Sequence, residues 1–397
     1  MVKSKISDNV NSIELSGIRK FYNKVVKVEG AISLTLGQPD FPVPDGIKEA
    51  MIKAINENKT VYTSNAGIVE LRQEVSNFLN NQGISYDKDE ICITVGGSEG
   101  LMDVFAAFIN TGDKVLIPTP AYPAYESCVK LLGGEIINYE LNKEDFSINF
   151  ESLKNTIKEE KPKLLVLSYP SNPTGAVLSK EARDKLYEIV KAEDIIVITD
   201  EMYSCLSFEE NYYSIAQFKD IKNKVIVVNG FSKMFSMTGL RIGYVCAADN
   251  YMDSIIKVHQ YNVSCAPSIA QYGVLQGLRN SMKDVENMKT QFVLRRDYVY
   301  KRLIDLGFQV ELPKGAFYIF PSIKKFASNS EEFCDKLLQQ AKVAVVPGSA
   351  FGKGGEGYIR ISYAYSQKQL EEAFDRIEKI LNLSLIHISE PTRLALI

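Results

Sequence analysis

Short apolar runs alternate with helix-like patterns between about Glu90 and Ala247. Most of these runs are apolar at successive positions, which is typical of strands buried on both faces. Strands that alternate with helices form βαβ units and a parallel sheet. We therefore predict an α/β domain whose large, mostly parallel sheet is flanked by helices. Its expected strands are residues 91–95, 115–117, 163–168, 195–199, 225–228 and 242–247.

The pattern changes after Asn280, where a long charged helix is predicted to about Leu306. Mixed strands and helices follow, which indicates a smaller α+β domain. The segment before Pro44 contains no βαβ unit, and its prolines mark a boundary, so we expect it to pack with the C-terminal part. The predicted division is a large domain over residues 45–282 and a small domain made of residues 1–44 with 283–382.

The last residues need separate treatment. Residues 383–393 resemble the translation of a sequencing-library adapter, so we expect residues 383–397 to be a non-native tail and exclude them from the fold. The sequence then does not provide the native C-terminus beyond about Leu381.

Composition favours small-molecule chemistry. Lys and Arg number 46 against 49 Asp and Glu, so the formal net charge is -3 and no positive field attracts nucleic acid or anionic lipid. No apolar run is long enough to span a bilayer. The six cysteines form no CxxC pair, which fits a reduced cytoplasm and predicts no metal site.

The strongest chemical signal is a lysine in a turn between two predicted strands. Lys233 lies in the segment 230–243, which also contains Arg241. An amine that attacks a carbonyl must be neutral, and a desolvated pocket with cations nearby lowers the pKa of a lysine. Taken alone, a solvated loop lysine is the more common case. The assignment of Lys233 therefore needs other motifs.

Segment 230–243 resembles, position by position, the lysine signature of the class I and II pyridoxal-phosphate-dependent aminotransferases of fold type I. The similarity of pattern runs from about Leu34 to Leu381. The resemblance implies a cytoplasmic enzyme with pyridoxal 5'-phosphate as cofactor, amino-acid and 2-oxo-acid substrates, and a homodimer with shared active sites. Lys233 would carry the cofactor as a Schiff base.

Two further motifs follow predicted strands. Asp200 ends the strand at 195–199, and α/β proteins bind ligands at the carboxyl ends of parallel strands. The resemblance implies that Asp200 pairs with the pyridine nitrogen, and that Tyr203 and Asn172 bind the phenolic oxygen. A buried carboxylate favours the protonated nitrogen that makes the cofactor an electron sink. Without the family resemblance, Asp200 could instead be a helix N-cap, and Asn172 could form an Asx-turn.

Residues 96–100 join a strand to a helix with three glycines. Free N–H groups at a helix start bind anions with the help of the helix dipole, and an arginine adds a bidentate cation. A glycine pair before a helix is common, so this motif alone is weak. The residues expected at the cofactor phosphate are Gly97, Ser98, Glu99, Ser232 and Arg241.

Two tyrosines are assigned by the resemblance. Tyr122 matches the residue that stacks on the pyridine ring, although an aromatic side chain there could equally belong to the core. Tyr62 resembles the tyrosine that reaches the phosphate of a neighbouring subunit, and in that case the active site requires a homodimer.

Arg360 is the expected substrate carboxylate ligand. It lies in the alternating segment 358–363, which places Ile359 and Ile361 on the opposite face of a strand. A planar guanidinium matches a carboxylate, although an exposed strand arginine would show the same pattern. Gly37 resembles the residue whose backbone closes over that carboxylate.

Two positions depart from the family pattern. Gly230 stands where a phosphate-binding serine is frequent, so part of that role is assigned to Ser98 and Ser232. Ser98 itself occupies a position where some aspartate-specific relatives carry a lysine. The expected amino donor is therefore an aromatic amino acid, aspartate or a broad range, with 2-oxoglutarate as an example of the acceptor.

The hypothesis for catalysis is transamination, with Lys233, Asp200 and Tyr203 as catalytic residues. Lys233 would move the α-proton as general acid and base, because His259 lies outside every motif. The same residues support β-elimination, so a C-S β-lyase acting on a cystathionine-like substrate is the alternative. A third and weaker alternative is a regulator that binds the cofactor without catalysis. Such regulators usually carry a DNA-binding domain, and we expect none before Leu34 in this sequence.

Overall fold

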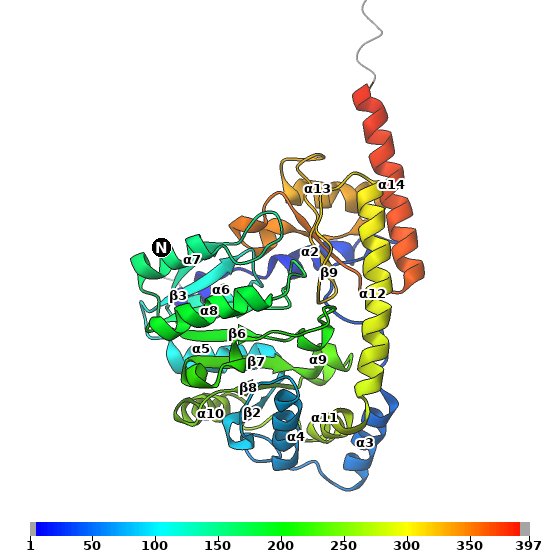
Figure 1. The fold of residues 1–397 in the computed structure, drawn as a ribbon. Helices are drawn as coiled ribbons and strands as arrows, with labels where there is room; N and C mark the ends of the chain where they lie inside the picture. Colours follow the sequence, from blue (N-terminus) through cyan, green and yellow to red (C-terminus); the bar gives the residue numbers. More distant parts are fainter. Residues whose placement is uncertain (1–4, 390–397) are drawn as a thin grey trace, which may run out of the picture.

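The computed structural model describes residues 5–389, and for residues 383–389 it describes the backbone alone. The expected non-native tail thus lies largely outside the described residues and stays a prediction. Figure 1 shows a broad sheet covered by helices, with a long helix along one side that leads to a smaller group of elements.

The central sheet has seven strands and is mostly parallel. Its five neighbouring strands β7, β6, β5, β3 and β4 are parallel to one another, while β8 is antiparallel to both β2 and β7. The prediction of a mostly parallel α/β sheet is confirmed. In spatial order the strands are β2 (Ile91–Thr94), β8 (Gly243–Cys246), β7 (Val225–Gly230), β6 (Ile196–Asp200), β5 (Leu164–Ser168), β3 (Lys114–Thr119) and β4 (Glu135–Glu140).

Helices cover both faces of this sheet, because alternate side chains of each buried strand point to opposite sides. Val166 and Ile198 pack with α5 (Gly96–Phe108), α6 (Ala124–Leu131) and α10 (Asp249–Val263). Leu165 and Val197 face the larger core. On that side lie α4 (Val69–Asn80), α7 (Phe150–Glu160), α8 (Lys180–Ala192) and α11 (Ser268–Asn280), and α3 (Asp45–Asn56) packs on α11.

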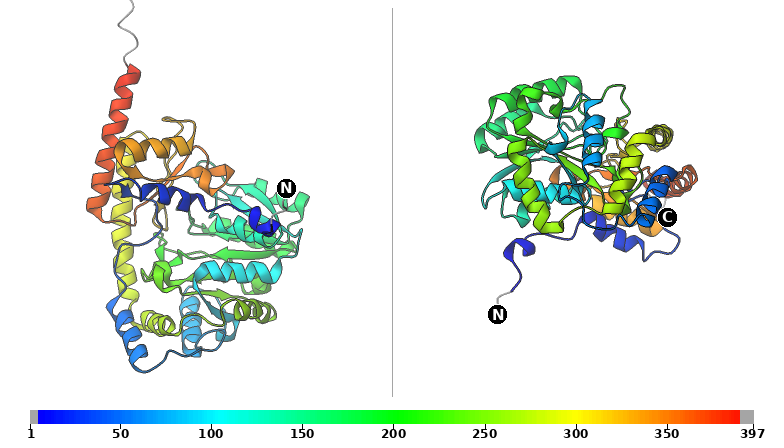
Figure 2. Two further views of the ribbon diagram at one scale, coloured as in Figure 1. Left: turned by 180° about the vertical axis from the view of Figure 1, so that it is seen from behind. Right: turned by 90° about the horizontal axis from the view of Figure 1, so that it is seen from below.

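A smaller group of elements combines the two ends of the chain. β1 (Ile32–Ser33) pairs with β10 (Val343–Ala344), and α2 (Gly17–Val25) crosses this group in the left view of Figure 2. The pairing of β1 with β10 favours the division of the chain into a large and a small domain, which remains a prediction. The remaining elements are α12 (Met282–Asp305), β9 (Tyr318–Ile319), α13 (Ser330–Lys336), β11 (Val346–Pro347), β12 (Ile359–Ser362) and α14 (Gln367–Ser389).

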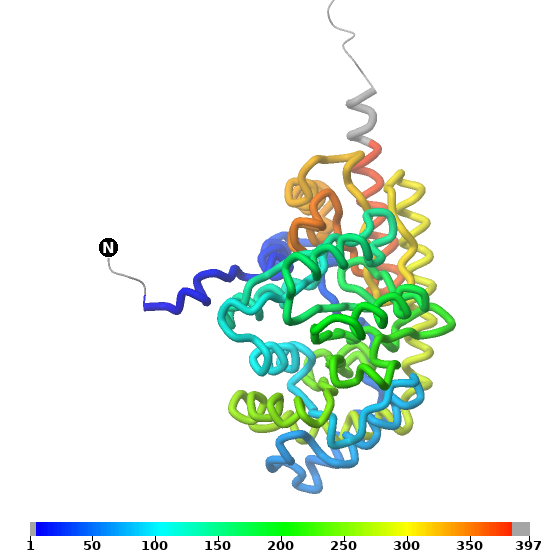
Figure 3. The backbone as a smooth tube through the Cα atoms, turned by 60° about the vertical axis from the view of Figure 1, so that its left-hand side comes forward, coloured from blue at the N-terminus to red at the C-terminus, as the bar shows by residue number. Residues whose placement is uncertain are grey.

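The N-terminal helix α1 (Asp8–Asn11) projects from the rest of the fold in Figure 3. None of its residues is buried, and it contacts the large sheet domain through a hydrogen bond from Asn9 Nδ2 to the carbonyl oxygen of Leu131, at 3.0 Å. Among the helices of the described residues, none has the length and apolar character needed to cross a membrane.

Two features of the sheet differ from the prediction. Strand β4 was not expected, and the reason is its position at the sheet edge, where Glu135 and Glu140 are exposed and the alternating pattern is weak. The antiparallel direction of β8, between β2 and β7, was not expected either. β8 is buried along its whole length, so its apolar sequence looks like that of a parallel strand.

Phe292 on α12 joins the N-terminal segment to the long helix. It is fully buried, and its ring lies 5.3 Å from that of Phe41 in an edge-to-face arrangement and 5.4 Å from that of Phe317. Phe292→Ala is expected to lower the free energy of unfolding in a urea titration by about 3–5 kcal/mol, because it leaves a cavity.

Leu294→Ala on the same helix is the matched control, because Leu294 is 58% exposed. Its expected effect is below about 0.5 kcal/mol. Equal losses in the two variants would contradict the anchoring role of Phe292.

Candidate active site

Three segments of the site begin where neighbouring parallel strands end. The strand register places Ser168 of β5 beside Asp200 of β6, and Asp200 beside Val228 of β7. The loop 169–175, Asp200 and the short helix α9 (Phe231–Met234) therefore leave the sheet at the same edge. Lys233 lies in α9.

The first turn of α5 reaches the same edge. Thr94 of β2 and Gly230 of β7 both pair with Gly243 of β8, so the turns that follow them lie side by side. Gly96 has a φ of +74°, in the left-handed region that favours glycine, and an added Cβ would lie 2.5 Å from Nη2 of Arg241. The guanidinium of Arg241 thus lies directly against the backbone that opens α5.

This first turn fits a phosphate group. The N–H groups of a first helical turn lack partners within the helix, and the helix dipole favours an anion there. Arg241 adds a cation, oriented by a hydrogen bond of 2.8 Å from Nη1 to the carbonyl oxygen of Thr238. A Cβ on Gly97 would lie 2.4 Å from Cε of Met202, so a larger residue there would require the end of the Met202 side chain to move.

Asp200 is buried and held in place by two donors. Oδ2 accepts a hydrogen bond of 2.7 Å from the hydroxyl of Tyr125, and Oδ1 accepts one of 3.1 Å from the N–H of Met202. Burial raises the pKa of Asp200, while these hydrogen bonds oppose the rise. Tyr125 was not predicted, although it follows Tyr122 by three residues and their rings are 5.7 Å apart.

Lys233 has a lowered pKa. Burial, together with the positive charges of Arg241 and Arg360, lowers the pKa of its amine from 10.5 to about 8. Nζ donates a hydrogen bond of 2.6 Å to the carbonyl oxygen of Gly37 in the N-terminal segment. A substantial fraction of this amine is therefore neutral near physiological pH, as attack on a carbonyl requires.

Arg360 connects the C-terminal elements to the sheet edge. Its side chain is fully buried, Nη1 donates a hydrogen bond of 2.8 Å to Oδ1 of Asn172, and Nη2 donates one to the carbonyl oxygen of Thr35. Nε has no hydrogen-bond partner among the described residues. The guanidinium thus retains a donor for a carboxylate, and Asn172 fixes its orientation.

The tyrosines expected in the site differ in position. Tyr203 is buried, and its hydroxyl lies 2.8 Å from that of Tyr318. Tyr122 lies near Asp200, whose charge adds to burial in raising the pKa of Tyr122, and it hydrogen-bonds to Ser98. Tyr62 is 85% exposed and does not join the other residues within one chain.

Glu99 lies in the first turn of α5, and both of its oxygens are bonded within the protein. Oε2 accepts a hydrogen bond of 2.8 Å from the N–H of Val95, and Oε1 lies 2.8 Å from Nδ1 of His259. Burial alone would lower the pKa of His259, but hydrogen bonds with Asp103 and Glu99 raise it to about 9. A charged histidine therefore stabilises Glu99 behind the first turn of α5.

The predicted residues form one connected group with few exceptions. Lys233 contacts Gly37 and lies in the field of Arg241 and Arg360, and Arg360 binds Asn172. Ser232, which precedes Lys233, is buried. The assigned roles stay predictions. Residues that contact this group and were not predicted are Thr35, Tyr125, His259 and Tyr318.

The family described as aminotransferase class I and II matches residues 29–377. The chain belongs to this family. The aspartate aminotransferase of Pyrococcus abyssi is 42% identical, with 95% of this chain and 98% of that protein covered. A probable N-acetyl-LL-diaminopimelate aminotransferase of Bacillus subtilis is 44% identical, with 94% and 95% covered.

Structural comparison agrees with the sequence comparison. The crystal structure of an aromatic aminotransferase from Pyrococcus horikoshii OT3 is 39% identical, covers 92% of this chain and 100% of its own, and superposes with a TM-score of 0.87. The predictions of fold type I and of transaminase activity are thereby confirmed. Aminotransferases of class I and II depend on pyridoxal 5'-phosphate.

The lowered pKa of Lys233 is open to direct measurement in the cofactor-free aminotransferase. The reactivity of Lys233 toward acetic anhydride is expected to rise as the pH passes about 8, because only the neutral amine reacts. Mass spectrometry of the peptide that contains Lys233 follows the labelling at each pH.

The control is the same protein unfolded in urea, where the midpoint should return toward 10.5. Coinciding midpoints in the folded and unfolded protein would show that the pocket does not lower the pKa.

Proposed function

We propose that this aminotransferase transfers the amino group of an L-amino acid to a 2-oxo acid such as 2-oxoglutarate, with pyridoxal 5'-phosphate held on Lys233. The observation that carries the proposal is the buried amine of Lys233, which donates a hydrogen bond to the carbonyl oxygen of Gly37 and whose pKa is lowered to about 8 by burial and by the charges of Arg241 and Arg360. Ordinary structural lysines are exposed and titrate near 10.4.

The residues present fit this cofactor. The first turn of α5, at Gly97 and Ser98, would hold the phosphate together with Arg241 and Ser232. Asp200 would pair with the pyridine nitrogen, Tyr203 and Asn172 would bind the phenolic oxygen, and Tyr122 would stack on the ring. When bound, the cofactor supplies an electron sink that stabilises negative charge at the α-carbon of the substrate.

The protein moves one proton. With its amine free, Lys233 would take the proton from the α-carbon of the substrate with Nζ as general base and would then, as general acid, give it to the C4' carbon of the cofactor. A pKa of about 8 suits both steps, since the amine is then neither fully protonated nor a poor acid. The carbonyl oxygen of Gly37 orients Nζ through its hydrogen bond of 2.6 Å.

The substrate carboxylate would bind Arg360. Its Nε is a buried donor without a partner among the described residues, and buried donors without partners are rare. Gly37 would close over the carboxylate from the N-terminal segment.

The amino donor is the less specific part of the proposal. The relatives named above act on aspartate, aromatic amino acids and N-acetyl-LL-diaminopimelate by their names, and they match this chain with similar identity. Ser98 does not provide a cation for a distal carboxylate. An aromatic, aspartate or broad donor range is the proposal.

The test is a panel of amino donors against 2-oxoglutarate. Transamination predicts glutamate and the matching 2-oxo acid in equal amounts, with turnover at least about a thousandfold lower in Lys233→Ala because the general base is lost. Pyruvate and ammonia from cystathionine, without an added 2-oxo acid, would instead indicate the β-lyase. Near-normal turnover of Lys233→Ala would refute the role of Lys233.

A homodimer with shared active sites is also part of the proposal. Tyr62 and its neighbour Val61 are 85% and 73% exposed, and Tyr261 is 87% exposed. Leu15, in the N-terminal segment, is 76% exposed. Exposed apolar side chains of this size fit burial against another chain, and a second subunit is the occupant that the role of Tyr62 requires.

Light scattering is expected to give twice the mass of one chain. Tyr62→Phe should keep this mass but weaken binding of pyridoxal phosphate by about tenfold, because a hydrogen bond to a charged group is lost. Tyr300→Phe, on α12, is the control and should retain wild-type affinity. A monomer with wild-type affinity would contradict the shared site.

A cytoplasmic location belongs to the proposal as well. The six cysteines are all free, and four of them are buried, so a reducing compartment suits them.

A further inference from the structure

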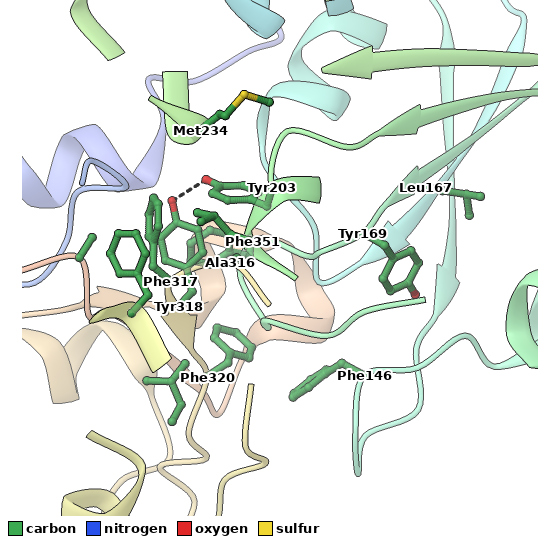
Figure 4. Close-up of a cluster of buried hydrophobic side chains, with 14 of the residues drawn as sticks. Phe146, Leu167, Tyr169, Tyr203, Met234, Ala316, Phe317, Tyr318, Phe320 and Phe351 are labelled. Carbon is green, nitrogen blue, oxygen red and sulfur yellow. Dashed lines mark hydrogen bonds between the residues drawn. The ribbon is translucent and has the colours of Figure 1, made fainter. Parts of the chain in front are cut away.

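Tyr318 contacts three residues assigned to the active site, although no motif includes it. It lies in β9, pairs with Ser362 of β12 and is 1% exposed. Its contacts are to Tyr203, Arg360 and Gly37, which belong to three distant parts of the chain. Figure 4 shows Tyr318 between Phe317 and Phe351, with its hydroxyl directed at Tyr203.

The first contact is between two hydroxyl groups. The oxygens of Tyr203 and Tyr318 are 2.8 Å apart, and either can be the donor. The rings meet edge to face with their centroids 5.6 Å apart, so the packing fixes both side chains. A tyrosine hydroxyl has one hydrogen. When Tyr203 donates it to a ligand, Tyr203 can only accept from Tyr318.

The second contact is with Arg360. The guanidinium carbon lies 4.3 Å from the centroid of the Tyr318 ring and 4.9 Å from that of Phe351. The aromatic faces attract the cation and hold its plane without using any of its N–H donors. Arg360 can thus be buried and oriented while its Nε remains available for a carboxylate.

The third contact explains the glycine at position 37. A Cβ added to Gly37 would overlap the hydroxyl oxygen of Tyr318. The backbone of Gly37 therefore lies directly on the Tyr318 hydroxyl, and its carbonyl oxygen accepts the hydrogen bond from Lys233.

We propose that Tyr318 is a positioning residue for transamination: its hydroxyl donates to Tyr203 and its ring orients Arg360. The inference rests on the proposed function, in which Tyr203 binds the phenolic oxygen of the cofactor and Arg360 binds the substrate carboxylate. The hydroxyl and the ring have separate tasks, so two substitutions can separate them.

Tyr318→Phe removes the hydroxyl and keeps the ring. Without the donor, Tyr203 stabilises negative charge on the phenolic oxygen less well, so the pH at which the absorbance of the bound cofactor changes should rise by about half to one unit. The KM for the best amino donor should stay within about twofold, because the ring still covers Arg360. The absorbance midpoint and the KM are both measured on the holoenzyme.

Tyr318→Leu also removes the ring. The KM for the amino donor should then rise by about five- to thirtyfold, with a smaller loss in kcat, because Arg360 loses an aromatic face. The affinity for pyridoxal phosphate should stay within about threefold, since the phosphate contacts lie at α5. If Tyr318→Leu does not fold, as judged by thermal denaturation, Tyr318→Phe decides alone.

Tyr139→Phe is the matched control. Tyr139 is equally buried, but it lies in β4, and its hydroxyl donates to the carbonyl oxygen of Val166 at 3.3 Å. The Tyr139→Phe substitution should leave the absorbance midpoint and the KM unchanged. This result would separate the effect of Tyr318 from the effect of losing any buried hydroxyl group.

The inference is overturned if Tyr318→Phe leaves the absorbance midpoint at the wild-type value, or if a folded Tyr318→Leu keeps the wild-type KM. Failure of the proposed function looks different, because then the wild-type protein itself binds no pyridoxal phosphate or transfers no amino group. In that case the role of Tyr318 is refuted with it.

Discussion

A buried amine beside two guanidinium groups is the interaction on which the site depends. Lys233 lies in the field of Arg241 and Arg360, and neither guanidinium forms an ion pair within the part of the chain that the structure describes. Their donors are bonded to neutral oxygens, such as Oδ1 of Asn172. Charges left unpaired in a low dielectric attract anions strongly and at the same time disfavour protonation of the amine. A single arrangement thus provides anion binding and a neutral nucleophile.

The fold places these charges on different parts of the chain. Arg241 follows α9 at the sheet edge, while Arg360 belongs to β12 in the smaller group of elements. The N-terminal segment connects the two sides, because Gly37 accepts the hydrogen bond from Lys233 and Thr35 accepts one from Arg360. One side of the site is suited to a phosphate and the other to a carboxylate, and the short stretch from Thr35 to Gly37 contacts the residues of both.

Part of this arrangement could be predicted from the sequence, and the reason differs from element to element. Strands such as β5 and β6 are apolar on both faces because helices cover both sides, and that pattern is readable. Strand β4 lies at the edge with exposed charges, so it has no such pattern. Tyr125, Tyr318 and His259 contact the site across 75, 115 and 160 residues of sequence, and no local motif records such contacts. Motif residues could be assigned because their local sequence resembles that of the family.

Gly230 shows how packing changes the expected set of site residues. Its φ of 177° is ordinary extended backbone, so the conformation does not require glycine. The surroundings restrict it instead, since an added Cβ would lie 3.0 Å from Cα of Gly243 and 3.1 Å from Cε of Met202. Both atoms belong to elements pressed against the first turn of α5, where Gly97 is also limited by Met202. A side chain at position 230 would need Met202 or the backbone around Gly243 to shift by a few tenths of an ångström. Glycine, rather than the serine that is frequent in the family, thus fits the close packing of position 230 against Gly243 and Met202.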